Sequence, residues 1–154
     1  MTSAIGAIYD ALAATTITVD SKAITVKDAD QIPNSVPAAN LPVRLLTPLA
    51  PFGVETGAES ITIGSSGGSQ PMVIDWTVAD IMLWAKVVSD VGVKAHAKDL
   101  ILYCAQYLDM LKTFANSYNV IDVRLVPDVI NYPVGSNDWF YSVRAVITVK
   151  EKFI

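Results

Sequence analysis

The side chains that could do chemistry are few and lie far apart in this sequence. His96 is the single histidine and Cys104 the single cysteine. A metal site needs several ligands, and His96 with Asp99 three residues later makes only a weak pair. Cys104 has apolar neighbours and no cation close by, so we expect a buried thiol rather than a nucleophile. His96 is predicted to be exposed at the start of a helix, and no metal, cofactor or disulfide is expected.

Other catalytic patterns are equally weak. A serine–histidine–aspartate system would have to use His96, and the sequence holds no Gly-X-Ser-X-Gly turn. The glycine- and serine-rich run that begins at Gly64 lacks the Gly-Lys-Ser/Thr ending of a phosphate-binding loop. Asp75 and Asp80 have opposite parity on a predicted strand, so their carboxylates should lie on opposite sides of it. We therefore expect that this protein is not an enzyme.

The composition favours a protein that buries surface against other chains. Of the 154 residues, 52% are hydrophobic and 17% charged, whereas typical soluble domains carry about 25% charged residues. No apolar run approaches the roughly 18 residues that span a bilayer, and the start lacks a signal-peptide pattern. We expect one domain that associates with copies of itself. A net charge of -4 disfavours a direct grip on nucleic acid.

Apolar periodicity predicts two helices. Ile5, Ile8 and Leu12 recur at spacings of three and four and predict a helix over Ser3–Ala14. A wider stripe of the same kind predicts a long helix over Lys94–Asn119.

Runs that alternate in polarity or are rich in β-branched residues predict the strands. The predicted strands are Ile17–Val19, Ala23–Val26, Val43–Leu49, Glu59–Ile63, Met72–Val88, Val120–Val126 and Trp139–Phe153. Met72–Val88 is expected to be one long strand, bulged near Ala79–Asp80 and covered on both faces in its second half. A helix over residues 77–88 is the alternative. Pro127 is expected to interrupt the strand before it.

The element order predicts an α+β fold. Strands adjacent in sequence favour a mainly antiparallel sheet, and the two helices should pack on one face of it. The order is α-β-β-β-(β)-β-α-β-β in a single domain over residues 1–154. Two loops are expected to be flexible, residues 50–71 and Asn131–Asp138.

The layout resembles the tail terminator, or tail-to-head joining, proteins of long-tailed bacteriophages. The likeness lies in the first helix, the proline-rich approach to an early strand (residues 32–37 and 41–46) and the long central strand. The single long helix and a closing strand that starts with Trp139, Phe140 and Tyr141 complete it. It spans most of the chain, in element order and size.

This resemblance implies a structural virion protein, assembled in the host cytoplasm. Such a subunit forms a ring, a hexamer by this resemblance, which caps the tail tube, stops its polymerisation and meets the head connector. DNA would pass through the channel without specific binding, and no membrane would be involved. The expected partners are copies of the chain, the tail-tube protein and the head-connector protein. The candidate contact residues lie in the two loops and beside them: Glu55, Glu59, Ser65, Gly67, Asn131, Tyr132, Asn137, Asp138 and Trp139.

Two alternatives belong to other classes. The chain could be another virion assembly subunit, such as a tail-tube or head-completion protein. It could also be a small-ligand-binding domain in which Trp76, Trp84 and Asp75 line a pocket. The tryptophans, and the aromatics at residues 139–141, are otherwise expected to pack in the core or at an interface.

Overall fold

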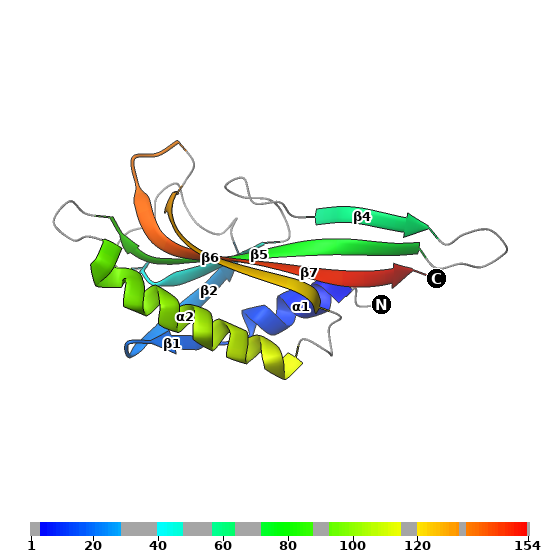
Figure 1. The fold of residues 1–154 in the computed structure, drawn as a ribbon, viewed down its shortest axis with the longest axis horizontal. Coiled ribbons are helices and arrows are strands. Elements are labelled where there is room, and N and C mark those ends of the chain that lie inside the picture. Colours follow the sequence, from blue (N-terminus) through cyan, green and yellow to red (C-terminus); the bar gives the residue numbers. More distant parts are fainter. Residues whose placement is uncertain are drawn as a thin grey trace.

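A computed structural model describes residues 4–28, 40–47, 57–63, 72–87, 93–114, 120–132 and 135–153. These residues form two helices and seven strands in the predicted order, which confirms the α+β class (Figure 1). The elements are α1 Ala4–Ala13, β1 Ile17–Val19, β2 Lys22–Asp28, β3 Val43–Thr47, β4 Gly57–Ile63, β5 Met72–Lys86, α2 Val93–Phe114, β6 Val120–Asn131 and β7 Trp139–Phe153.

The strands form one mostly antiparallel sheet in the order β1-β2-β3-β5-β7-β6. β4 pairs with the first half of β5, and β3 pairs with its second half. The β2–β3 pair is parallel. The predicted hairpin between β1 and β2 turns at Asp20 and Ser21, whose φ angles are 51° and 61°. Positive φ at both central residues gives a tight turn with the twist that antiparallel strands need.

β5 is the long central strand that the sequence predicts. Its residues from Thr77 to Trp84 are all buried, as expected for a strand covered on both faces. This burial agrees with the apolar run that follows Asp80, because a strand covered on both faces carries no polar stripe. The predicted bulge is misplaced: the pairing with β7 shifts between Leu83 and Ala85, and Ala79–Asp80 pair regularly.

Both helices pack on the same face of the sheet, as predicted (Figure 1). Ile8 and Leu12 of α1 and Tyr103 and Tyr107 of α2 are fully buried there. They meet the side chains of β5 and β7 that point to this face, such as Val78. The described part of α2 ends at Phe114, and the last five residues of the predicted helix lie outside the described residues.

A second apolar cluster covers the other face. The paired ends of β6 and β7 curve away from the helices, as the orange end of β7 shows in Figure 1. This curvature places Ile130, Tyr132 and Phe140 against Leu45 and Ile81 on the face opposite the helices. The sheet therefore has two cores, and the β6–β7 hairpin contributes to both.

Pro127 does not interrupt β6, which corrects the prediction. The strand runs unbroken from Val120 to Asn131, with Pro127 opposite Val143 of β7. Among the described strands β6 pairs with β7 alone and is an edge of the sheet. Proline fits an edge strand where its missing N–H would have faced away from the partner.

Candidate interaction surface

A buried ion pair fixes the two helices to the sheet. Arg44 of β3 and Asp80 of β5 are both fully buried, and their side chains form a salt bridge. The Arg44 Nε donates to Asp80 Oδ1 and Oδ2 at 3.3 and 3.2 Å. In the β3–β5 register Arg44 lies opposite Met82 and Asp80 lies opposite Leu46, so the side chains join the two strands diagonally. The sequence pattern does not predict this pair, because both residues sit in runs that read as ordinary strand.

The same guanidinium caps the end of α1. Arg44 Nη1 donates to the Thr15 carbonyl at 2.8 Å, and Nη2 donates to the Leu12 carbonyl at 3.4 Å. The last turn of α1 has no basic residue of its own. A cation at a helix C-terminus satisfies unpaired carbonyls and the negative end of the helix dipole. Arg44 thus connects α1 to the sheet through carbonyls at the C-terminal end of the helix.

Two tyrosines of α2 complete this buried polar cluster, which comprises Arg44, Asp80, Tyr103 and Tyr107. The Tyr107 hydroxyl donates to Asp80 Oδ2 at 2.7 Å. The Tyr103 hydroxyl makes no hydrogen bond within the described residues. Burial, and next the Asp80 carboxylate, raise the pKa of both tyrosines well above 10, while Arg44 acts in the opposite sense. Burial alone would lower the pKa of Arg44, but the Asp80 carboxylate raises it above its ordinary value.

The complete burial of this cluster indicates a structural role. All four residues are fully buried between the helices and the sheet, so a substrate could reach them only if the core opened. An ion pair in such a place joins elements in a fixed arrangement. The cluster therefore serves to position α2, whose other side faces outward.

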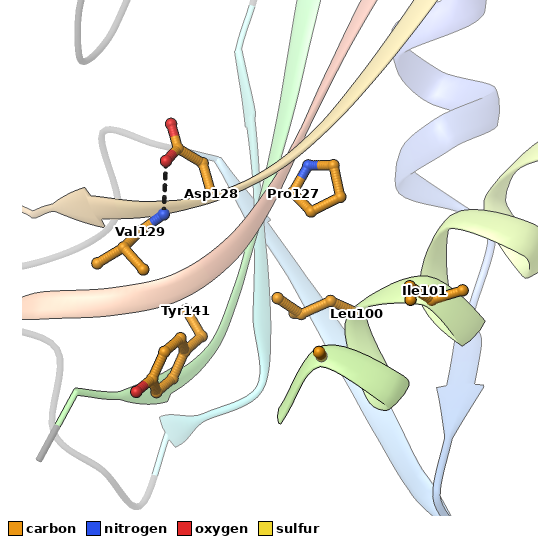
Figure 2. Close-up of a pocket in the computed structure, with 7 residues that line it drawn as sticks. Leu100, Ile101, Pro127, Asp128, Val129 and Tyr141 are labelled. Carbon is orange, nitrogen blue, oxygen red and sulfur yellow. Dashed lines mark hydrogen bonds between the residues drawn. The ribbon is translucent and has the colours of Figure 1, made fainter. Parts of the chain in front are cut away.

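The outward side of α2 is apolar where it approaches β6. Ile101 and Leu108 are 64% and 47% exposed, high values for large aliphatic side chains in a helix. A groove of about 370 Å³ lies between this part of the helix and β6. Its lining residues come from α2, β6 and β7: Ala97, Leu100, Ile101, Pro127, Asp128, Val129 and Tyr141 (Figure 2).

The single charged group at this groove is already engaged. Asp128 Oδ1 accepts the Val129 N–H at 2.7 Å, and Oδ2 accepts from Arg144 Nη2 at 2.9 Å. Figure 2 shows the carboxylate turned away from Leu100 and Ile101. The groove therefore presents an apolar lining.

The edge of β6 differs along its length. Tyr132 N donates to the Asp138 carbonyl across the hairpin at 3.1 Å. In an antiparallel strand the backbone N–H and C=O groups of alternate residues point toward the partner strand. Here those of the even-numbered residues point toward β7, and those of the odd-numbered residues point outward. Pro127 has no N–H to offer at the edge, and the Val129 N–H already binds Asp128. Val123 and Leu125 are left as outward positions whose backbone N–H can donate to a neighbouring strand and whose C=O can accept from it.

The predicted contact residues of the β6–β7 hairpin have mixed environments. The Asn131 amide donates to the carbonyls of Ser136 and Asp138 at 2.7 and 2.8 Å, and its Oδ1 accepts the Gly135 N–H. The described part of this loop is thus tied together, although it was expected to be flexible. Tyr132 is buried in the second core and is not a surface residue.

The remaining hairpin residues are more accessible. Asn137 is exposed, and Trp139 is half exposed and stands beside Val87, whose N–H donates to the Trp139 carbonyl at 2.9 Å. Asp138 pairs with Lys86 at 3.7 Å. The three aromatics therefore divide: Phe140 and Tyr141 are core residues, as predicted, and Trp139 has the exposure of a contact residue.

The other predicted positions have separate outcomes. Glu55, Ser65 and Gly67 lie outside the described residues, and Glu59 falls within β4, of which the structure describes the backbone. The ligand-pocket residues Trp76 and Asp75 belong to the first half of β5, where the side chains are not described. Trp84 is 5% exposed, packs in the main core and does not line the groove.

His96 and Cys104 have structural environments. His96 is half buried, which corrects the predicted exposure, because its ring packs on Tyr141 with centroids 4.6 Å apart. Cys104 is partly buried against the core, and burial raises the pKa of its thiol. No group of three potential metal ligands occurs within the described ranges. Across those same ranges, no helix is long and apolar enough to cross a membrane.

A scan against protein-family models and a search of curated proteins both found no match to this sequence.

Proposed function

We propose that this protein is a structural assembly subunit of the tail-terminator kind, which closes into a ring on the end of a phage tail tube. The observation that carries the proposal is the β6 edge from Ile121 to Val126, with which no described strand other than β7 pairs. There Ile121 and Val126 are 50% and 40% exposed beside the outward backbone positions Val123 and Leu125. An edge strand with exposed aliphatic residues is a surface that another chain can cover.

The confirmed element order supports the same proposal. The resemblance to tail terminators lies in a first helix, a long central strand, one long helix and a closing strand, and α1, β5, α2 and β7 have these forms. The buried polar cluster holds the helices against the sheet, which gives the subunit a defined outer surface. In a ring, contact geometry performs the function and no reaction is required.

Ring closure needs a head-to-tail contact. The β6 edge of one copy would meet a different surface of the next copy, because identical patches would form a closed dimer instead. The ion pairs Asp122–Arg124 and Asp128–Arg144 lie along β6 and would set the register of the contact. A subunit of net charge -4 also suits a channel through which DNA passes without being held.

The test compares two single substitutions of equally exposed aliphatic residues. Val126→Lys places a charge at the β6 edge, and Leu102→Lys places one on α2 at a site that is 41% exposed. Mass photometry over a concentration series should show a discrete ring-sized species for the wild-type protein and for Leu102→Lys. Val126→Lys should remain a monomer with an unchanged circular dichroism spectrum.

Other outcomes decide against the proposal. Open polymers of increasing length would indicate a tail-tube subunit. A strict monomer at micromolar concentration, with or without tube protein, would remove the assembly role and favour a ligand-binding domain.

A further inference from the structure

Helix α2 has a second apolar stripe beside the one that faces the sheet, with Cys104 at its inner margin against the main core and Ile101 and Leu108 facing outward. Ala97, Ile101, Cys104 and Leu108 recur at steps of four, three and four, and we name these four residues the α2 seam. The sheet-facing stripe uses other positions, such as Leu100 and Tyr107. Ala97 and Cys104 are half buried, and Ile101 and Leu108 are the most exposed large aliphatic residues in the described part of the helix. A heptad-like seam of this kind is the surface that one helix offers to another.

The groove lies directly beside this seam. Ala97 and Ile101 belong to both, and Leu100, Pro127, Val129 and Tyr141 complete the apolar lining. In Figure 2 the α2 residues stand on one side and the β6 residues on the other. A cavity of about 370 Å³ is large enough to receive bulky side chains from a partner.

A partner cannot add a strand at this groove. Pro127 lacks an N–H, and the Val129 N–H already donates to the Asp128 carboxylate. Both groups face the outer edge of β6, so the backbone ladder that strand addition needs is blocked here. The occupant must therefore bind through side chains, and the spacing of the seam matches a helix.

The charges beside the seam are mostly basic. Lys94, Lys98 and Lys112 lie seven before, three before and eleven after Ile101, which places them on the same exposed side of the helix. Asp109 is the one exposed acid within the described part of α2. The protein as a whole is acidic, so this basic margin is a local feature that suits an acidic partner.

A second copy of this chain does not fit the seam. Antiparallel pairing of two α2 seams about their midpoint would bring Lys112 of one copy beside Lys94 of the other, at both ends. Like charges at such positions disfavour a helix pair. The exposed face of α1 carries Asp10 and small residues, such as Ala13, that would leave the groove unfilled.

We propose that the α2 seam and its groove bind an acidic amphipathic helix of a different protein. The seam from Ala97 to Leu108 is about 16 Å long, which matches roughly three turns of a partner helix. The partner would place large apolar residues at steps of three and four into the groove and hold Glu or Asp against Lys94, Lys98 and Lys112. This surface is distinct from the β6 edge proposed for ring closure, and the inference does not depend on that ring.

Two matched probes test the inference. Both are stapled helical peptides of about 14 residues with leucines at the seam spacing, and they differ only in having Glu or Lys at the flanking positions. Fluorescence anisotropy with the full-length protein should show binding of the Glu peptide. The Lys peptide should bind at least about tenfold more weakly, and added salt should reduce the difference.

Variants locate the binding site. Ile101→Ser should weaken binding of the Glu peptide about tenfold, because it removes an anchor shared by seam and groove. Leu102→Ser, at a site that is 41% exposed on another side of α2, should leave binding unchanged. Lys98→Glu with Lys112→Glu should reverse the preference between the two peptides.

Several results of these experiments would contradict the inference. Equal binding of both peptides, no binding of either, or binding that ignores Ile101→Ser would overturn the inference. Self-association that Ile101→Ser abolishes would make a second copy the occupant instead. Val126→Lys should not change peptide binding, so failure of the ring proposal and failure of this one give different results.

Discussion

The two stripes of helix α2 meet opposite surroundings. On the sheet side, Tyr103 and Tyr107 enter a core that also encloses the Arg44–Asp80 ion pair. On the flank toward β6, Ile101 and Leu108 stand in the open beside an apolar groove. Polar groups are thus buried on one side of the helix while aliphatic groups are exposed on the other.

The sheet-facing stripe of α2 therefore serves the fold, and the stripe toward β6 is available for interaction. Buried charges are tolerated where each has partners, and Arg44 has Asp80 and two helix carbonyls. Exposed aliphatic residues contribute little to the stability of one chain but gain from a partner that covers them. The comparison predicts that changes on the sheet side act on folding and that changes on the β6 side act on association.

The largest effect is expected from breaking the buried ion pair. Asp80→Asn leaves the Arg44 guanidinium buried without a countercharge and should lower the free energy of unfolding by about 3–5 kcal/mol. Urea denaturation followed by circular dichroism measures it. Asp122→Asn is the control, because its pair with Arg124 is more than half exposed and should change stability by less than about 1 kcal/mol. Equal losses in both variants would contradict the structural role of the cluster.

Removal of a single hydroxyl group should cause a smaller loss of stability. Tyr107→Phe removes a hydrogen bond to a buried carboxylate and should cost about 1.5–3 kcal/mol. Tyr103→Phe removes a hydroxyl that has no hydrogen bond within the described residues, so it should be nearly neutral or stabilising. The two variants share ring, helix and burial, and differ in the bond to Asp80. If Tyr103→Phe were the more damaging change, the assignment of that bond would be wrong.

Alkaline pH should lower the free energy of unfolding through the two buried tyrosines on the sheet side of α2. Burial, then Asp80, raise the pKa of Tyr103 and Tyr107 in the folded protein above the ordinary value of 10.0. Below pH 10 both states keep these protons, and stability is unaffected. Above it the unfolded chain loses them first, so each tyrosine lowers stability by about 1.4 kcal/mol per pH unit. Unfolding of wild type and the two Phe variants from pH 8 to 11.5 should show a shallower decline in each variant. Identical slopes would contradict the assignment.

Much of the fold was predictable because its elements have strong local patterns. The long helix, the central strand and the closing strand each repeat an apolar period over many residues, and β7 begins and ends where predicted. Pro127 was misjudged because proline breaks a strand only where an N–H is needed, and edge position depends on the whole sheet.

The buried ion pair and the interaction surface were harder to predict. Arg44 and Asp80 lie 36 residues apart, and nothing local shows that their side chains meet. The hydrophobic pattern of the sequence holds one clue, because Asp80 is the single charged residue in the otherwise apolar run from Val78 to Trp84. The groove joins α2 to β6 and β7, so no stretch of sequence contains it. The polar loop in the sequence predicts Asn131 and Tyr132 as contact residues, but their neighbours in the folded hairpin decide their roles.

The smallest effect on stability is expected at Ile101, and it is the most informative about the two stripes. Ile101→Ser should change the free energy of unfolding by less than about 0.5 kcal/mol, because the side chain is 64% exposed. Leu100→Ser, one residue earlier and 5% exposed, should cost about 2–4 kcal/mol. Differential scanning calorimetry on both variants measures the contrast. A large loss from Ile101→Ser would mean that the flank of α2 stabilises the single chain, and the groove would then be part of the core rather than a surface for a partner.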